Sequence, residues 1–395
     1  MAWRTRASLT PNEARQLHQE ALVIDSKFAA TLSVPSKRVR AFFDEHVATF
    51  GQPGSLDRRT VEARTKDLAA QELWESQEAR EAYLQQWKDI GVDAGIVSVG
   101  VVHPGGDAAF TACVSRIARE VYTPVLTSNG RIRIALSAAD IEEAHRSGCH
   151  ALIVGCENST PVSPDLDRLD VLYNLGMRYL QLTYNLRNLA GDGCTERGGG
   201  GLSVFGAELV RRLNEKRMIV DLSHANARTA LDAVRVSTSP VSISHGSAKG
   251  VFAHDRATED EVLKAVADRG GYIGVYVVPG FLQANSEATL DQWAEHVEYI
   301  ARLVGIDHVG IGTDLGEVYT IPPEKASYES HYPPGFPWHG FSREHRSFVT
   351  KMHGYRNILD WPNLTMHLAK RGFNEEEIRK LIGLNFLRFF RDTVG

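Results

Sequence analysis

The pattern of hydrophobic positions divides most of the chain into short apolar runs and the helix-like stretches that alternate with them. The apolar runs are rich in β-branched residues, which is typical of buried strands, whereas the stretches between them place apolar residues at helical spacing. The strand-like runs cover residues 21–25, 92–102, 151–157, 179–185, 218–224, 240–245, 272–278 and 307–314, with a shorter candidate at 131–136. Strands that alternate with helices in this way predict parallel β-α-β units.

With about eight such units, the pattern favours an α/β fold, as a closed (β/α)8 TIM-like barrel rather than an open sheet. No Gly-x-Gly-x-x-Gly motif follows the first strand, which argues against a dinucleotide-binding sheet. We expect residues 1–395 to form one barrel domain with extra helices at both ends. The segment 317–355 interrupts the alternation and is rich in proline and histidine, so we expect a lid or specificity loop there.

The composition is that of an ordinary globular protein: 43% of the residues are hydrophobic, 24% are charged and the formal net charge is −5. A nucleic-acid partner is not expected, because such proteins usually carry clustered basic residues. No stretch reaches the roughly 18 uninterrupted apolar residues of a membrane span, so no membrane partner is expected either. The four cysteines form no Cys-x-x-Cys pair, which favours a reducing compartment, the cytoplasm.

Polar and titratable residues stand at the ends of several predicted strands. In a (β/α)8 barrel, the C-terminal ends of the strands converge on one site. Read in chain order, these residues are Lys27, Glu157, Tyr184, His224, His245 and Asp314. One glutamate and two histidines from separate strands match the ligands of a catalytic zinc ion, so we predict Glu157, His224 and His245 as ligands of Zn²⁺. Asp314 is then placed to deprotonate the attacking water.

Each of these residues also has an ordinary structural interpretation. A single histidine at a strand end is more often a hydrogen-bonded core residue, although two on successive strands, each after a serine, favour a shared role. Glu157 is also consistent with an ion pair, and Asp314 with a helix N-cap. Lys27 is consistent with a solvated loop charge and Tyr184 with a packed aromatic ring. Arg256 is either a surface salt-bridge partner or a clamp for a substrate carboxylate.

Several of these stretches resemble the membrane (renal) dipeptidase family, whose members are zinc dipeptidases with an amidohydrolase-like barrel. The matching stretches are residues 155–157, 175–183, 218–224, 240–246 and 308–314, and the tail 382–388 resembles the closing helix of the family. The resemblance runs from residue 21 to the C-terminus. It implies a barrel of the metallo-dependent hydrolase type and a metal-dependent hydrolase activity.

The resemblance also implies a role for each residue that matches. Glu157 resembles the glutamate that bridges two zinc ions, and His224 and His245 resemble the two histidines of the second zinc. Arg256 stands where the substrate-carboxylate arginine of the family is expected, and Asp314 matches its catalytic aspartate.

Two places depart from the family pattern. Family members carry a His-x-Asp pair after the first strand, which binds the first zinc, but here Lys27 and Ala29 occupy those positions. An ammonium group has no lone pair and alanine has no donor atom, so neither replaces its counterpart. Tyr184 stands where the family has a histidine that polarises the scissile carbonyl, and a phenol donates a hydrogen bond without the charge of an imidazolium.

We therefore expect one zinc ion rather than two, with the ammonium of Lys27 near the place of the missing ion. The leading interpretation is a divergent dipeptidase-like zinc hydrolase that cleaves an amide bond in a small, carboxylate-bearing or dipeptide-like substrate. One alternative is a non-hydrolytic tailoring enzyme, of isomerase or lyase type, that uses Tyr184, Lys27 or Asp314 as acid or base. Another is a catalytically silent binding protein on the same scaffold. The resemblance also suggests a homodimer.

Overall fold

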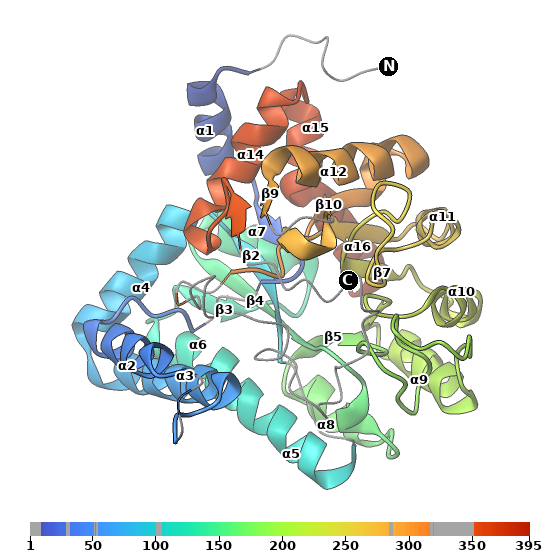
Figure 1. Cartoon of the computed structure of the whole chain (residues 1–395), viewed down its shortest axis with the longest axis horizontal. Helices are drawn as coiled ribbons and strands as arrows, with labels where there is room; N and C mark the ends of the chain where they lie inside the picture. Colours follow the sequence, from blue (N-terminus) through green and yellow to red (C-terminus); the bar gives the residue numbers. More distant parts are fainter. Residues whose placement is uncertain are drawn as a thin grey trace.

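A barrel of parallel strands lies at the centre of the molecule, and helices surround it (Figure 1). The computed structural model describes residues 9–28, 32–50, 52, 54–99, 105–283, 287–316, 319 and 351–395. The barrel strands, in spatial order, are β1 (Ile24–Asp25), β2 (Ala94–Ser98), β4 (His150–Cys156), β5 (Met177–Gln181), β6 (Ile219–Asp221), β7 (Ser242–Gly246), β8 (Tyr272–Val275) and β10 (Val309–Ile311). The (β/α)8 fold predicted from the alternation is confirmed.

Backbone hydrogen bonds between the first and last strands join the two edges of the barrel. The N–H group of Ser26 donates to the carbonyl of Ile311 over 3.0 Å, and the N–H group of Asp314 donates to the carbonyl of Lys27 over 3.1 Å. These bonds bring the chain after β1 next to the chain after β10. The short strand β3 (Ile132–Ile134) pairs in parallel with β4 and lies off the barrel path.

Helices connect the strands and cover the outside of the barrel (Figure 1). In chain order, each of the helices α8 to α12 lies between two successive barrel strands. The α-helices are α1 (Pro11–Glu20), α2 (Lys37–Ala48), α3 (Arg58–Glu75), α4 (Gln77–Ile90), α5 (Gly106–Ile117), α6 (Thr123–Thr127), α7 (Ala138–Arg146), α8 (Arg168–Asn174), α9 (Val204–Glu215), α10 (Ala227–Val236), α11 (Asp260–Asp268), α12 (Leu290–Val304), α14 (Trp361–Lys370), α15 (Glu375–Arg379) and α16 (Asn385–Thr393). Within the described part of the chain, no helix combines the length and the apolar character needed to cross a bilayer.

Polar residues begin the helices where the amphipathic pattern starts. Ser137, which the sequence predicts as a cap, accepts a hydrogen bond from the N–H group of Asp140, and the Asp140 carboxylate accepts one from the N–H group of Ser137. Thr10 and Glu13 form the same reciprocal pair at the start of α1. Such caps satisfy backbone donors that a helix leaves free and contribute roughly 0.5–2 kcal/mol each.

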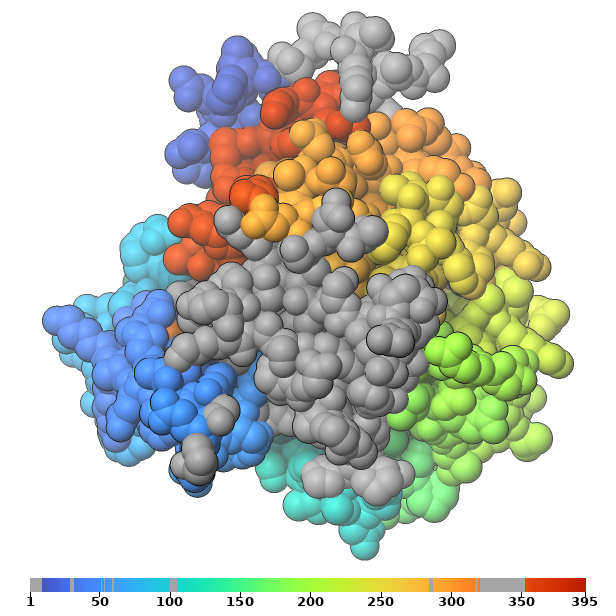
Figure 2. Space-filling view, viewed as in Figure 1, coloured from blue at the N-terminus to red at the C-terminus, as the bar shows by residue number. Residues whose placement is uncertain are grey.

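The extra helices at the two ends of the chain pack together beside the barrel. α1 lies against α14, and the Nδ1 atom of His18 is 2.8 Å from the hydroxyl oxygen of Thr365. In Figure 2 the blue surface of α1 accordingly adjoins the red surface of the C-terminal helices. The extra helices predicted at both ends therefore form one flank of the molecule.

Aromatic rings fill part of the barrel interior. Tyr179 and Tyr272 are buried there, and glycines leave room for them. A Cβ atom at Gly155 would lie 2.3 Å from the Cδ1 atom of Tyr179, and one at Gly310 would lie 2.3 Å from the hydroxyl of Tyr272. Phe386 of α16 packs edge-on against Tyr272, with ring centroids 5.1 Å apart. Burial of each large ring contributes roughly 2 kcal/mol, so the interior of the barrel is a packed core.

The segment 317–355, predicted as a lid, is described only at Tyr319 and from residue 351 onward. Its last part contains β11 (Lys351–His353), which pairs in parallel with β9 (Glu287–Thr289) in a separate small sheet. The rest of the predicted lid lies outside the described residues, as does Ala29. The lid therefore stays a prediction.

Candidate metal centre

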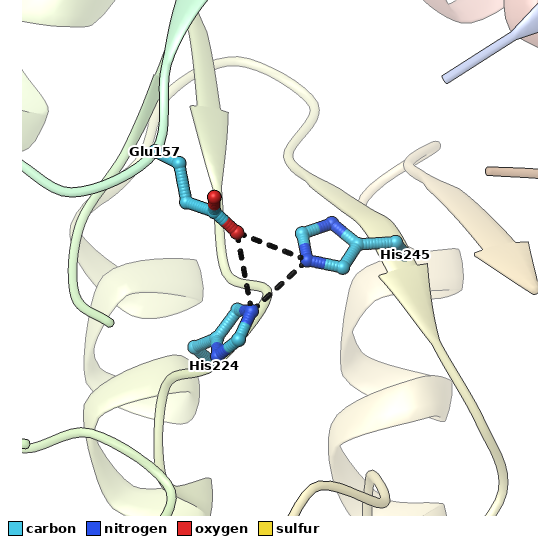
Figure 3. A group of neighbouring side chains, drawn as sticks. All are labelled: Glu157, His224 and His245. Atoms are coloured by element: carbon cyan, nitrogen blue, oxygen red, sulfur yellow. Dashed lines mark hydrogen bonds and ion pairs between the residues drawn. The ribbon is translucent and has the colours of Figure 1, made fainter. Parts of the chain in front are cut away.

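Three predicted ligand atoms face one another at the C-terminal mouth of the barrel (Figure 3). The Nε2 atoms of His224 and His245 are 3.0 Å apart, and the Oε1 atom of Glu157 lies 3.4 Å from the first and 3.5 Å from the second. A tetrahedral zinc ion with ligands at about 2.0–2.1 Å holds those ligands roughly 3.3–3.4 Å apart. The triangle therefore has the size of one face of a zinc tetrahedron, and two imidazoles with one carboxylate form a donor set suited to that ion.

Different backbone arrangements bring the three side chains together. Glu157 directly follows β4 and His245 belongs to β7, so the barrel itself places both. His224 comes after the end of β6 and adopts the left-handed backbone region, with φ of 64°. That conformation costs a residue with a side chain roughly 1–2 kcal/mol. The N–H group of Cys194 donates to the carbonyl of His224 over 2.6 Å and helps to hold the turn.

A buried amide orients the His224 ring. The Nδ1 atom of His224 lies 2.6 Å from the Oδ1 atom of Asn185, which is fully buried. An amide oxygen can only accept a hydrogen bond, so His224 donates from Nδ1. The proton is therefore on Nδ1, and Nε2 presents its lone pair to the triangle.

A chain of hydroxyl groups orients the His245 ring in the same sense. The Nδ1 atom of His245 lies 2.8 Å from the hydroxyl oxygen of Ser244, which is 3.0 Å from the hydroxyl of Tyr179. Tyr179 donates to the carboxylate of Asp221 over 3.0 Å, so its oxygen accepts from Ser244, and Ser244 accepts from His245. This direction of donation leaves Nε2 of His245 free to bind an ion.

The Asp221 carboxylate that ends this chain is fully buried and accepts four hydrogen bonds. Its donors, at 2.6–3.0 Å, are the hydroxyl groups of Tyr179 and Ser242 and the N–H groups of Ser223 and Ser244. Burial raises the pKa of Asp221, against the effect of its hydrogen bonds. The carboxylate joins the ends of β6 and β7, which carry the two histidines.

Asp25, at the end of β1, is a second buried carboxylate that accepts four hydrogen bonds. Its carboxylate accepts hydrogen bonds from the N–H group of Lys27, the N–H and hydroxyl groups of Thr313, and the indole N–H of Trp361. These bonds tie the chain after β1 to the chain after β10. Asp25 and Asp221 each follow two aliphatic residues at the end of a strand. The same arrangement, a buried carboxylate that joins two neighbouring strand ends, therefore occurs on both sides of the barrel.

The ammonium of Lys27 pairs with the oxygen of Glu157 that does not face the histidines. Nζ lies 3.0 Å from Oε2, and both side chains are largely shielded from solvent. Burial would raise the pKa of Glu157, but the charge of Lys27 and the hydrogen bonds with the histidines outweigh it and hold that pKa well below its usual range. Glu157 is therefore ionised, with one oxygen held by the lysine and the other directed at the triangle.

Both histidines are neutral at physiological pH. Burial, helped by the positive charge of Arg256, lowers the pKa of His224 to about 3, even though the nearby carboxylate of Glu157 opposes it. Burial also lowers the pKa of His245 well below its ordinary value. A metal ligand needs a neutral imidazole with a free lone pair, and the site supplies two.

Asp314 follows β10 and has a left-handed backbone, with φ of 54°. Burial and the nearby negative charge of Glu157 raise its pKa to about 7, although the charges of Lys27 and Arg256 act in the opposite direction. These mutual effects place Asp314 among the charged groups of the site. A carboxyl group with a pKa near neutrality can both take up and release a proton.

Arg256 and Tyr184 lie beside the histidines. The Nη2 atom of Arg256 donates to the carbonyl of His245 over 2.9 Å, and the guanidinium lies 5.5 Å from the ring centre of Tyr276. The buried Nε atom of Arg256 has no hydrogen-bond partner among the described residues. The ring of Tyr184 stacks on that of His224, with centroids 4.2 Å apart and planes inclined by 22°.

The structure thus brings the predicted residues Lys27, Glu157, Tyr184, His224, His245, Arg256 and Asp314 to one end of the barrel. Sequence reasoning missed Asn185 and Asp221, which orient the two histidines. For Asp221 a signal existed, because an acid at the end of an aliphatic strand is seldom left without several donors. For Asn185 no local signal existed, since its partner stands thirty-nine positions later in the chain.

Residues 12–333 match the family described as membrane dipeptidase, peptidase family M19. Among curated proteins, "Dipeptidase verJ" of Clonostachys rogersoniana is 29% identical over 270 residues, which are 68% of this chain and 62% of that protein. The match therefore spans less than two thirds of that relative's length.

Solved structures agree with this match. An amidohydrolase from Pseudomonas aeruginosa is 28% identical, with a TM-score of 0.69 over 98% of this chain and 100% of that one. A probable dipeptidase, PvdM, from the same organism is 19% identical, with a TM-score of 0.71 over 97% and 98% of the two chains, and supports the barrel fold. Since the family match covers most of the residues that build both the barrel and the metal centre, the chain belongs to the membrane dipeptidase family.

Proposed function

We propose that this protein is a zinc-dependent hydrolase that cleaves an amide bond in a small substrate bearing a carboxylate. The observation that carries the proposal is the triangle of Glu157 Oε1, His224 Nε2 and His245 Nε2, with edges of 3.0, 3.4 and 3.5 Å. Membership of a dipeptidase family supports the same reaction class. When bound there, a zinc ion supplies Lewis acidity, which polarises a carbonyl group and makes water more acidic.

Asp314 moves the proton in this proposal. Its carboxylate takes a proton from the attacking water and gives it to the amide nitrogen as the C–N bond breaks. The same group serves as base and then as acid, which requires a pKa near the working pH. The pKa of about 7 that burial produces for Asp314 meets this requirement.

Arg256 binds the carboxylate of the substrate, and Tyr184 stabilises the oxygen of the scissile carbonyl. The buried Nε donor of Arg256 has no partner among the described residues, so it remains available for a charge-assisted hydrogen bond. Tyr184 stacks on the ring of a proposed ligand, which keeps it next to the reacting carbonyl. A phenol donates one hydrogen bond there and supplies part of the stabilisation of the developing negative charge.

Lys27 and the lack of the His-x-Asp ligand pair together limit the site to one zinc ion. Its ammonium occupies one oxygen of Glu157, at 3.0 Å, and that oxygen would otherwise be available to a second ion. A positive charge next to the carboxylate also disfavours a second divalent cation. Lys27 therefore acts as a positioning residue that holds Glu157 ionised and correctly oriented.

Hydrolysis and zinc binding measured on the same variants test the proposal. Wild-type protein loaded with zinc should hydrolyse some members of a panel of L,L- and L,D-dipeptides and their N-acyl derivatives. His224→Ala should abolish this activity and remove the bound zinc. His145→Ala, which changes a histidine paired with Asp93 away from the triangle, serves as a matched control and should retain both. Unchanged hydrolysis in His224→Ala would refute the proposal.

A further inference from the structure

The acids at the mouth of the barrel leave little negative charge for a substrate. Asp25 and Asp221 each accept four hydrogen bonds from the protein itself. Glu157 uses one oxygen for Lys27 and directs the other at the two histidine rings. Of the four carboxyl groups placed at the site above, Asp314 is the one that remains. The proposed function already assigns it to proton transfer, which an ammonium bound to it would block.

Two positive side chains stand close to the place where the scissile carbonyl must sit. Arg256 contacts the backbone of His245. Lys27 is separated from the triangle by the width of one carboxylate group, since its Nζ atom lies 3.0 Å from Oε2 of Glu157 and the triangle uses Oε1. A divalent ion held by the triangle adds further positive charge. An amide carbonyl that reaches the triangle is therefore within a few ångströms of the ammonium of Lys27.

A free-amine dipeptide brings its own positive charge to this place. Its α-ammonium nitrogen is about 2.5 Å from the scissile carbonyl carbon, because both are bonded to the same Cα atom. Two like charges at such short range in a partly buried site repel strongly, and the carboxylates of Asp25, Asp221 and Glu157 are already bound by groups of the protein. An acyl group on the same nitrogen removes the charge and leaves the rest of the substrate unchanged.

We propose that the site accepts substrates whose nitrogen end is uncharged, that is, N-acylated amino acids or N-blocked dipeptides with a free carboxylate, in preference to free-amine dipeptides. This inference rests on the proposed function and names its substrate class. In the reaction, the oxygen of water forms a bond to the acyl carbon and the C–N bond breaks. One proton of water goes to the leaving nitrogen, which yields a carboxylic acid and an amine without any other reactant.

Binding of two matched probes tests the inference without turnover. The probes are a phosphinate mimic of Ala-Ala with a free amino group and the same molecule with an N-acetyl group. Calorimetry on the zinc-loaded protein should give a dissociation constant at least about tenfold lower for the acetylated probe. Equal binding, or tighter binding of the free-amine probe, would overturn the inference.

Three variants assign the preference to the charge of Lys27. Lys27→Met should reduce the ratio of the two dissociation constants several-fold, because one of the positive charges near the carbonyl is lost, whereas Lys27→Arg, which keeps the charge, should preserve it. Lys380→Met removes a lysine paired with Asp307, in the helical turn before α16, and should leave the ratio unchanged. A ratio that is unchanged in Lys27→Met would also overturn the inference.

The probe-binding experiment and the hydrolysis assay distinguish a failure of the charge selection from a failure of the proposed function. A clear preference for the acetylated probe without hydrolysis of any amide would refute the proposed function and support the charge selection. Hydrolysis of free-amine dipeptides as fast as of their N-acyl derivatives, with no difference between the probes, would refute the charge selection and support the proposed function.

Discussion

The Nδ1 atom of His224 lies 2.6 Å from the Oδ1 atom of Asn185. Because an amide oxygen cannot donate, this contact places the proton of the imidazole on Nδ1 and its lone pair on Nε2. The ring is thereby ready to bind an ion before any ion arrives. Since Asn185 belongs to the chain after β5 and His224 to the chain after β6, the contact also fixes these two loops relative to each other.

Asn185→Leu should weaken zinc binding by about 10–100-fold, because the ring of His224 loses the acceptor that orients it. Asn185→Asp keeps an acceptor at the same place and should stay within a few-fold of the wild type. Competition with a chromophoric chelator measures the zinc dissociation constants directly. If the leucine variant binds zinc as tightly as the wild type, Asn185 does not orient the ligand.

Asp221→Asn should lower the free energy of unfolding by about 1–3 kcal/mol, because the new NH₂ group cannot accept the hydrogen bonds now made to one carboxylate oxygen. Urea unfolding of the metal-free protein measures this loss. Asp268→Asn changes an exposed aspartate at the end of α11 and should stay within about 0.5 kcal/mol of the wild type. Equal effects of the two substitutions would contradict the role given to Asp221.

The raised pKa of Asp314 makes a specific prediction for stability against pH. The folded state holds this proton up to about pH 7, whereas an unfolded aspartate releases it near its ordinary pKa of 3.8. Between these values the folded state binds more protons than the unfolded chain, so its stability should fall as the pH rises. In metal-free protein, wild type should therefore lose about 3–4 kcal/mol relative to Asp314→Asn over this interval. A difference between the two proteins that does not change with pH would exclude the pKa shift.

Arg256→Met should lower kcat/KM for carboxylate substrates by about 10–100-fold, mainly through KM, because a charge-assisted hydrogen bond to the substrate is lost. The matched substrate is the same compound with its carboxylate converted to a carboxamide. Wild type should cleave this carboxamide poorly, and Arg256→Met should cleave it about as well as wild type does. An equal loss on both substrates would indicate that Arg256 only supports the backbone of His245.

Most of the barrel was predictable because its strands and helices carry strong local patterns. The apolar run at 151–157 matches β4 (His150–Cys156) to within one residue at each end, and the cap at Ser137 begins α7 as expected. Strand ends were less predictable. The run 179–185 continues past the end of β5 at Gln181, because Leu182 and Thr183 are also buried and the N–H group of Leu182 still donates to the carbonyl of Asp221 in β6.

The sequence predicted the residues of the site that stand at converging strand ends. It did not predict the hydrogen bonds that orient them. His224, His245 and Glu157 come together because parallel strands deliver their ends to one place. The contact of Asn185 depends on loop turns, such as the left-handed backbone of His224, which no pattern in the chain encodes. The strand-end acid Asp221 carried a signal, but its partners on β5 and β7 could not be read from the sequence. The position of Lys27 near the metal centre was expected, because Lys27 replaces a zinc-binding histidine of the family. The structure adds the geometry of its contact with Glu157.

Replacing Lys27 and Ala29 by the pair that the family carries should create a second metal site. We expect the double variant Lys27→His with Ala29→Asp to bind two zinc ions per chain, because it removes the ammonium from Glu157 and supplies two further donors. Lys27→Met, which removes the charge without adding a ligand, serves as the control and should bind one. A double variant that still binds a single ion would show that more than these two residues separates the protein from a two-zinc site.

The number of zinc ions in the wild-type protein tests the central claim most directly. Elemental analysis of purified protein, dialysed against a weak chelator and compared with protein concentration, gives the number of tightly bound ions per chain. Our account predicts one zinc ion, and none in His224→Ala. Two tightly bound zinc ions per wild-type chain would contradict it, because Lys27 would then not take the place of the second ion.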